Sequence, residues 1–291
     1  MAHVTLKEIL KDAQERHYGI PCLAGVTLEM ILGIIKAAEE KQAPIIMCYN
    51  KQLASDISIE MVLPVIVKEA QKAKVPIATI LDHGSDFELV MKAIHYGSKA
   101  VMFDGSGLPY EENIMRTKEV VKVAHALGVS VEAELGGVGG SVMEATGTSA
   151  TESVFTNVNE AVEFVKRTEV DCLAISFGNV HGKYKGTPNL DLQLVKRISY
   201  SVDVPLAMHG ASGLNFSDYG PIIDSGISKI NYFSAMCLPF YGELDKFINE
   251  SPEEAFCIRT IPMTVNFWYE QTKKVLDVLR CSWKSGNYYK P

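Results

Sequence analysis

Eight short apolar runs, each ending near a polar residue or a glycine, alternate with longer amphipathic segments from residue 20 to about residue 247. This alternation is typical of βα units, and runs that are apolar throughout favour parallel strands buried on both faces. Eight consecutive units favour closure into an α/β TIM barrel, a (β/α)8 fold, over an open sheet. The expected strands are Ile20–Ala24, Pro44–Cys48, Pro76–Leu81, Ala100–Phe103, Ser130–Ala133, Cys172–Ser176, Pro205–Met208 and Ser228–Ile230.

The length of 291 residues suits one barrel, so we expect a single domain over residues 1–291. A hydrophobic content of 47% and a charged content of 22% are typical of a soluble globular protein. The formal net charge of −7, without a basic patch, argues against a nucleic-acid or anionic-membrane partner. No apolar run approaches the roughly 18 residues of a membrane-spanning helix, and the amino terminus does not read as a secretory signal.

The cysteines form no Cys-x-x-Cys pair, which argues against a thiolate zinc site or a redox pair. Free thiols fit a reducing compartment, so the sequence predicts a cytoplasmic protein. Residues 111–126 have the apolar spacing of a helix that Gly128 ends. Residues 136–156 form a long Gly/Ser/Thr-rich connection of the kind often used as a lid or binding segment.

Polar residues recur where the expected strands end, which is where a barrel builds its active site. Three of the seven histidines, His83, His181 and His209, share this rim although they lie far apart in the sequence. A lone histidine is more often structural, but three neutral imidazoles at one pole suit a catalytic zinc with an open position. The other four are interpreted as surface or structural residues: His3, His17, His95 and His125.

Carboxylates accompany these histidines. Asp82 directly precedes His83, so the two side chains diverge if the strand continues and meet at one site if the chain turns; a capping aspartate is the alternative interpretation. Glu132 and Glu134 share one face of the fifth expected strand. An inward Glu134 near the rim would bind a metal, orient a histidine or transfer a proton.

Glycine-rich or polar turns follow the last three expected strands, at Gly182, at residues 210–213 and at residues 231–234. Barrels commonly bind phosphate groups in this region through backbone amides and helix amino termini. Together these turns predict a substrate that carries phosphate.

The chain resembles class II aldolases that cleave ketose phosphates, including the fructose-bisphosphate and tagatose-bisphosphate enzymes. The resemblance implies a zinc-dependent lyase that reversibly cleaves a ketose 1-phosphate or a ketose bisphosphate to dihydroxyacetone phosphate and an aldehyde. It also implies one catalytic Zn²⁺, allows for a monovalent cation, and suggests a homodimer or homotetramer. The motifs that carry it, in order, are DHGSDFE (82–88), FDGS (103–106), SVEAELGGVGG (130–140), GNVHGKYKG (178–186), LAMHGASGL (206–214) and KIN (229–231).

The resemblance assigns roles to individual residues. Asp82 would be the general acid that protonates the aldehyde oxygen in condensation, and the base in cleavage. Zinc would polarise the substrate carbonyl and stabilise the enediolate, which Asn231 would contact. The implied metal ligands are His83, His181 and His209, with Glu134 as an additional or alternative ligand and Asp104 as a further acid beside the metal. The residues implied to hold the phosphate are Gly182, Gly210, Ser212 and Ser234.

Several positions depart from the family pattern. Family members carry a proton-transferring glutamate on a mobile loop after the fifth strand. The corresponding loop here, residues 139–149, lacks the usual acidic cluster, and Glu144 is the nearest candidate. The family's Phe-Asn after the first strand is Leu23-Ala24, a serine after the second strand is Asn50, and the Thr-acid pair is Ser234-Ala235. The family's arginine that binds the distal phosphate of a bisphosphate substrate has no clear counterpart here. Arg259 is the nearest candidate, in a divergent carboxyl-terminal helical region at about residues 252–291.

These departures concern the aldehyde end, while the metal and enediolate residues are kept. Asn50 is therefore expected to contact substrate, and the aldehyde is expected to differ from glyceraldehyde 3-phosphate, an unphosphorylated aldehyde included. Two alternatives stay open. One is a zinc-dependent sugar or sugar-phosphate epimerase on the same barrel, and the other is a non-catalytic aldolase-like subunit, against which the intact Asp82 and histidine set argue.

Overall fold

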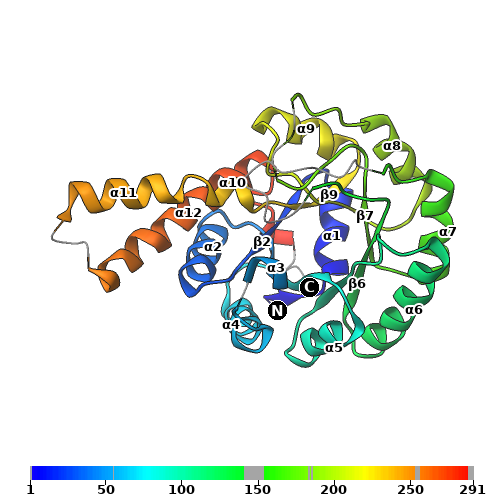
Figure 1. Cartoon of the computed structure of the whole chain (residues 1–291), viewed down its shortest axis with the longest axis horizontal. Helices are drawn as coiled ribbons and strands as arrows, with labels where there is room; N and C mark the ends of the chain where they lie inside the picture. Colours follow the sequence, from blue (N-terminus) through cyan, green and yellow to red (C-terminus); the bar gives the residue numbers. More distant parts are fainter. Residues whose placement is uncertain are drawn as a thin grey trace.

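The computed structural model of the chain describes residues 2–54, 56–140, 154–182, 184, 186–252 and 256–287. Eight parallel strands form a closed barrel surrounded by helices, which confirms the predicted fold (Figure 1). Each strand pairs with its neighbours in chain order, and the last pairs with the first. The strands are β2 (Ile20–Ala24), β3 (Ile45–Asn50), β4 (Ile77–Gly84), β5 (Ala100–Phe103), β6 (Ser130–Leu135), β7 (Cys172–Ile175), β8 (Leu206–Met208) and β9 (Ile227–Asn231).

The helices between the strands bury one apolar face on the barrel. Side chains cap several of them: Thr27, Asp86 and Asp191 each accept a hydrogen bond from a backbone N–H of the first helical turn. The barrel helices are α2 (Leu28–Glu40), α3 (Lys51–Ala54), α4 (Ile59–Lys72), α5 (Phe87–His95), α6 (Tyr110–Ala126), α7 (Val158–Thr168), α8 (Leu192–Ser201) and α9 (Phe216–Asp224).

A short amino-terminal unit precedes the barrel. Strand β1 (His3–Val4) pairs with the start of β4, and helix α1 (Leu6–Glu15) begins at a capping box between Thr5 and Glu8. Helix α1 packs against β4, β6 and β9, and its Lys7 backbone N–H donates to Ser130 Oγ at the start of β6. This unit therefore covers the amino-terminal end of the barrel and leaves the carboxyl-terminal end for a site.

Strand β4 is irregular where it reaches that end. Its pairing with β5 shifts register between Leu81 and Gly84, and His83 has a φ of 50° in the left-handed region. Such a bulge re-aims side chains. The side chains of Asp82 and His83 consequently reach the same site. Of the two arrangements considered from the sequence, the chain therefore has the one in which it turns and the side chains meet.

After β9 the chain forms α10 (Ser234–Cys237), α11 (Phe240–Glu250), the 3₁₀ turn η2 (Cys257–Arg259) and α12 (Thr260–Val278). Helices α11 and α12 form an arm that projects from the barrel (Figure 1). The base of the arm packs tightly on α2, since a Cβ added at Gly33 would lie 2.5 Å from the Val265 carbonyl oxygen. In the described part of the chain, no helix combines the length and apolar character needed to cross a membrane.

Candidate metal centre and active site

Three imidazole rings meet at the carboxyl ends of β4, β7 and β8. His83 lies in β4, His181 in the loop after β7, and His209 directly after β8. The Nε2 atom of His83 lies 2.9 Å from Nδ1 of His209, and one nitrogen of each of the three rings lies within 4.8 Å of the others. One cation can therefore contact all three nitrogens.

Buried acids fix how two of these rings present their nitrogens. His83 Nδ1 donates to Asp104 Oδ2 at 2.8 Å, and His209 Nε2 donates to Glu132 Oε1 at 2.9 Å. Because a carboxylate only accepts, these contacts leave Nε2 of His83 and Nδ1 of His209 facing the centre, and each offers a lone pair to a metal when its ring is neutral. The buried Nε2 of His181 has no hydrogen-bond partner in the described part of the chain. Three imidazole nitrogens placed in this way fit zinc.

Acidic groups also gather behind His83. His83, Asp104 and Glu134 offer ligand atoms within 4.8 Å of one another. Burial raises the pKa of Glu134 to about 8, and its buried Oε2 has no partner among the described residues. Burial lowers the pKa of His83, but the Asp82 charge and the Asp104 hydrogen bond outweigh it and raise the pKa to about 10. This excess of negative charge favours a cation at the cluster.

Asp82 lies beside the three histidines without joining them. Its Oδ1 accepts from Asn231 Nδ2 and its Oδ2 accepts from Asn50 Nδ2, each at 2.9 Å. Its Oδ1 is 3.9 Å from His209 Nδ1. Burial raises the pKa of Asp82, but electrostatic interactions, largest with His83 and then with His209 and Lys229, outweigh it and lower the pKa below its usual value. The carboxylate is therefore ionised, and two amides hold it in place beside the three histidines.

Lys229 and Glu132 form a buried ion pair under the site. Lys229 Nζ donates to Glu132 Oε1 at 2.9 Å and to Asn231 Oδ1 at 2.6 Å, and both charged side chains are fully buried. The pair thus orients His209 through Glu132, and Asp82 through Asn231. Lys229 was not predicted as a site residue, although it lies two residues before Asn231 on the same strand face, where an inward charge needs a partner.

Two other expected residues have different surroundings, and a third lies outside the described residues. Asn50 is fully buried and does not line the cavity beside the histidines; its side chain donates to Asp82 and accepts from the backbone N–H groups of Gln52 and Leu53. Its expected contact with substrate stays a prediction. Arg259 is exposed in η2, on the arm between α11 and α12, and does not line that cavity. Glu144 lies outside the described residues.

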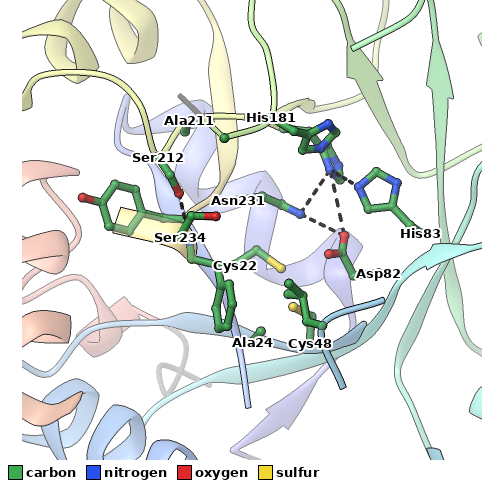
Figure 2. Close-up of a pocket in the computed structure, with 16 residues that line it drawn as sticks. Cys22, Ala24, Cys48, Asp82, His83, His181, Ala211, Ser212, Asn231 and Ser234 are labelled. Atoms are coloured by element: carbon green, nitrogen blue, oxygen red, sulfur yellow. Dashed lines mark hydrogen bonds and ion pairs between the residues drawn. The ribbon is translucent and has the colours of Figure 1, made fainter. Parts of the chain in front are cut away.

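One cavity unites nine of the expected residues (Figure 2), while Asp104 and Glu134 line a second cavity that shares His83 and His181 with it. Gly210 has a φ of 71°, and a Cβ there would lie 2.3 Å from the Val180 carbonyl oxygen, so the loops after β7 and β8 touch through their backbones. Ser212 Oγ accepts from the Phe233 backbone N–H at 3.1 Å, which ties the loop after β8 to the chain after β9. The cavity is lined by the carboxylate, imidazole and amide groups of Asp82, His83, His181, His209 and Asn231, and also by Gly182, Gly210, Ser212 and Ser234.

Known proteins share both this fold and this sequence pattern. The family model described as class II fructose-bisphosphate aldolase matches residues 4–283. The chain is 40% identical over 234 residues to a probable fructose-bisphosphate aldolase of Bacillus subtilis (strain 168), covering 79% of this chain and 81% of the relative. It is 32% identical over 288 residues to the sulfofructosephosphate aldolase of Alkalicoccus urumqiensis, covering 99% and 100%.

Among solved structures, the YdjI aldolase of Escherichia coli K12 superposes with a TM-score of 0.86 at 32% identity, covering 97% of this chain and 99% of that one. The family match spans almost the whole chain, and the relatives carry aldolase names. This confirms the class predicted from the motifs. The chain belongs to the class II fructose-bisphosphate aldolase family and is an aldehyde-lyase of that class.

Proposed function

We propose that the chain catalyses reversible aldol cleavage of a ketose phosphate to dihydroxyacetone phosphate and an aldehyde, with zinc held by His83, His181 and His209. The observation that carries this proposal is the convergence of three imidazole nitrogens beside an ionised Asp82 that two amides hold in place. When bound there, zinc supplies Lewis-acid polarisation of the substrate carbonyl. The acid cluster of Asp104 and Glu134 supports Glu134 as an additional or alternative ligand.

Side chains of the protein transfer the protons to and from the substrate. Asp82 takes the hydroxyl proton in cleavage and returns it to the aldehyde oxygen in condensation. Asn50 and Asn231 each donate to one oxygen of Asp82, so the carboxylate keeps one orientation in both directions. Asn231 also lines the cavity, where it contacts the enediolate. Glu144 is the proposed proton carrier for the reacting carbon of dihydroxyacetone phosphate.

Gly182, Gly210, Ser212 and Ser234 are the proposed phosphate site for dihydroxyacetone phosphate. They line the cavity from the loops after β7, β8 and β9, and offer backbone amides and hydroxyls. Among the described residues that line the cavity there is no lysine or arginine. The described part of the cavity therefore supports one phosphate and gives no cationic group for a second.

The proposal is tested by incubating zinc-loaded protein with dihydroxyacetone phosphate and a panel of aldehydes, with and without a chelator. We expect a ketose 1-phosphate product that is lost on chelation and recovered with zinc, because carbonyl polarisation requires the metal. Release of dihydroxyacetone phosphate from the purified product checks the reverse direction. Interconversion of ketose phosphates without this release would support the epimerase instead, and absence of stoichiometric zinc would support the non-catalytic subunit.

We also propose that the arm joins copies of this chain into the homodimer or homotetramer. Helix α11 has no buried residue in the single chain, and apolar side chains stand exposed along the arm, with Tyr241 79% and Ile258 65% exposed. Exposed apolar patches of this kind mark association surfaces. Five cysteines are free thiols, which supports the proposed cytoplasmic location: Cys22, Cys48, Cys172, Cys237 and Cys281.

A double variant, Tyr241→Asp with Ile258→Asp, is expected to shift the protein to monomers, since charges on the arm oppose apolar contact between copies. Light scattering coupled to size-exclusion chromatography measures the mass. Leu127→Asp is the matched control, because Leu127 is also exposed but follows α6, away from the arm. An unchanged mass in the double variant, or a monomeric unmodified protein, would refute the assigned surface.

A further inference from the structure

The cavity has one wall that the chemistry proposed above does not use. Cys22 and Ala24 of β2, Cys48 of β3, Leu53 of α3 and Phe233 after β9 line it, and we call these five residues the apolar wall. Figure 2 shows Cys22, Ala24 and Cys48 on the side of the cavity across from Ala211 and Ser212. The wall carries no carboxylate, amide, hydroxyl or cationic side chain.

Neighbouring polar side chains point elsewhere. Asn50, the next inward residue of β3 after Cys48, is buried under Asp82 and donates to it. Tyr232 also lines the cavity, but its ring packs edge-on against Tyr219 of α9, with centroids 6.0 Å apart. The wall therefore offers a bound molecule few hydrogen bonds besides those of two thiols.

The thiols of Cys22 and Cys48 form a hydrogen bond with each other. A hydrogen bond to Cys22, followed by burial, raises the pKa of the Cys48 thiol well above its usual value, so it stays protonated and neutral. Thiols are weak donors and weak acceptors, and buried cysteine behaves as a small hydrophobic side chain. Cys22 and Cys48 consequently add to the apolar character of the wall.

The wall lies where the aldehyde must lie. In the strand register Cys22 pairs with Asn231, whose side chain donates to Asp82, and Cys22, Cys48, Asp82 and Asn231 line the same cavity, so the wall borders the reacting centre. Figure 2 shows Asp82 with His83 and His181 on one side and Cys48 on the other. The aldehyde oxygen lies at Asp82, while Ser212 and its neighbours hold the phosphate of the donor across the cavity. The rest of the aldehyde therefore extends against the apolar wall.

We infer that the acceptor is an aliphatic aldehyde without hydroxyl or phosphate substituents, bound against Cys22, Ala24, Cys48, Leu53 and Phe233; this rests on the aldolase function proposed above. The new bond joins C3 of dihydroxyacetone phosphate, which loses one proton, to the carbonyl carbon of the aldehyde, whose oxygen gains one. No further reactant is consumed. A hydroxyl buried on this wall without a partner loses its hydrogen bonds to water, which lowers kcat/KM by about tenfold.

The test compares aldehydes of equal carbon number with zinc-loaded enzyme and dihydroxyacetone phosphate: propionaldehyde, lactaldehyde, glyceraldehyde and glyceraldehyde 3-phosphate. Concentrations are corrected for the free carbonyl form by NMR. We expect kcat/KM to fall by about tenfold with each hydroxyl and to be lowest for the phosphorylated aldehyde. Equal or higher kcat/KM for glyceraldehyde or its 3-phosphate than for propionaldehyde would overturn the inference.

Variants of the apolar wall test whether these residues cause the preference for an aldehyde without hydroxyl groups. Ala24→Ser and Cys48→Ser each add a hydroxyl there, and each is expected to lower the propionaldehyde-to-lactaldehyde ratio of kcat/KM several-fold. Cys237→Ser is the matched control, because Cys237 does not line the cavity, and it is expected to leave the ratio unchanged. An unchanged ratio in both folded wall variants would overturn the assignment, and the aldehyde series on unmodified enzyme decides the matter if neither variant folds.

A half-reaction separates this inference from the proposed function. Exchange of the C3 hydrogen of dihydroxyacetone phosphate with solvent deuterium needs no aldehyde. If exchange proceeds while glyceraldehyde is preferred, only the apolar acceptor is refuted. If zinc-loaded enzyme shows no exchange, the proposed function fails as well.

Discussion

Replacement of Asp82 by asparagine is expected to lower the rates of aldol cleavage and condensation by about two to four orders of magnitude, the usual contribution of general acid–base catalysis. The variant keeps the shape of the side chain but can no longer carry the proton. Steady-state assays in both directions measure the loss. Asp203→Asn is the control, since Asp203 is exposed ahead of β8 at the other end of the barrel, and it should retain full activity.

The zinc content of the Asp82→Asn variant should equal that of the unmodified protein. Asp82 Oδ1 lies 3.9 Å from His209 Nδ1, and the three histidines present their nitrogens to the metal without it. Metal analysis of both proteins after dialysis checks this. Full activity in the variant would refute the proton-carrying role, whereas a parallel loss of zinc would make Asp82 a metal-site residue.

Replacement of Lys229 by methionine is expected to lower the free energy of unfolding by about 3–5 kcal/mol, because it leaves a buried charge without its partner. The Lys229 ammonium is 2.9 Å from Glu132 Oε1, and the other oxygen of Glu132 already has no partner in the described part of the chain. Urea denaturation of the metal-free proteins measures the change. Lys92→Met, which removes an exposed pair with Glu88, should cost only about 0.3–0.5 kcal/mol.

A second substitution distinguishes the effect of the unpaired charge from the effect of altered packing at the Lys229–Glu132 pair. Adding Glu132→Gln to Lys229→Met removes the unpaired charge, so the double variant should recover much of the lost stability. The double variant also loses the carboxylate that orients His209, so its zinc affinity should stay low. If Lys229→Met alone were no less stable than Lys92→Met, the buried pair would not have the energetic role assigned to it.

Local sequence patterns predicted most of the barrel because each strand is an apolar run. Strands β3, β4 and β6 end later than expected, at Asn50, Gly84 and Leu135. Polar rim residues interrupt the apolar pattern there, but their backbones remain paired with the next strand. Strand β1 has two residues and therefore no periodicity to detect.

The candidate site was predictable where each residue follows a strand, as His83, His181 and His209 do. The ion pair between Glu132 and Lys229 was not predictable, because the two residues lie 97 positions apart in the sequence and meet only across the closed barrel. Asn50 was expected to contact substrate because it stands where the family has a serine; its hydrogen bond to Asp82 depends on the pairing of β3 with β4 and was not predicted. The position of the arm was not predictable either, because it depends on tertiary packing of the arm's base against α2 at Gly33.

The most direct test of the proposed chemistry is deuterium exchange at C3 of dihydroxyacetone phosphate, followed by NMR without any aldehyde. We predict exchange by the zinc-loaded protein and by its Asp82→Asn variant, because Asp82 acts only on the aldehyde oxygen. Exchange should disappear on chelation, return with zinc, and be absent in His83→Ala. No exchange by protein that holds stoichiometric zinc would contradict the proposal that these histidines and their metal activate the ketose-phosphate donor.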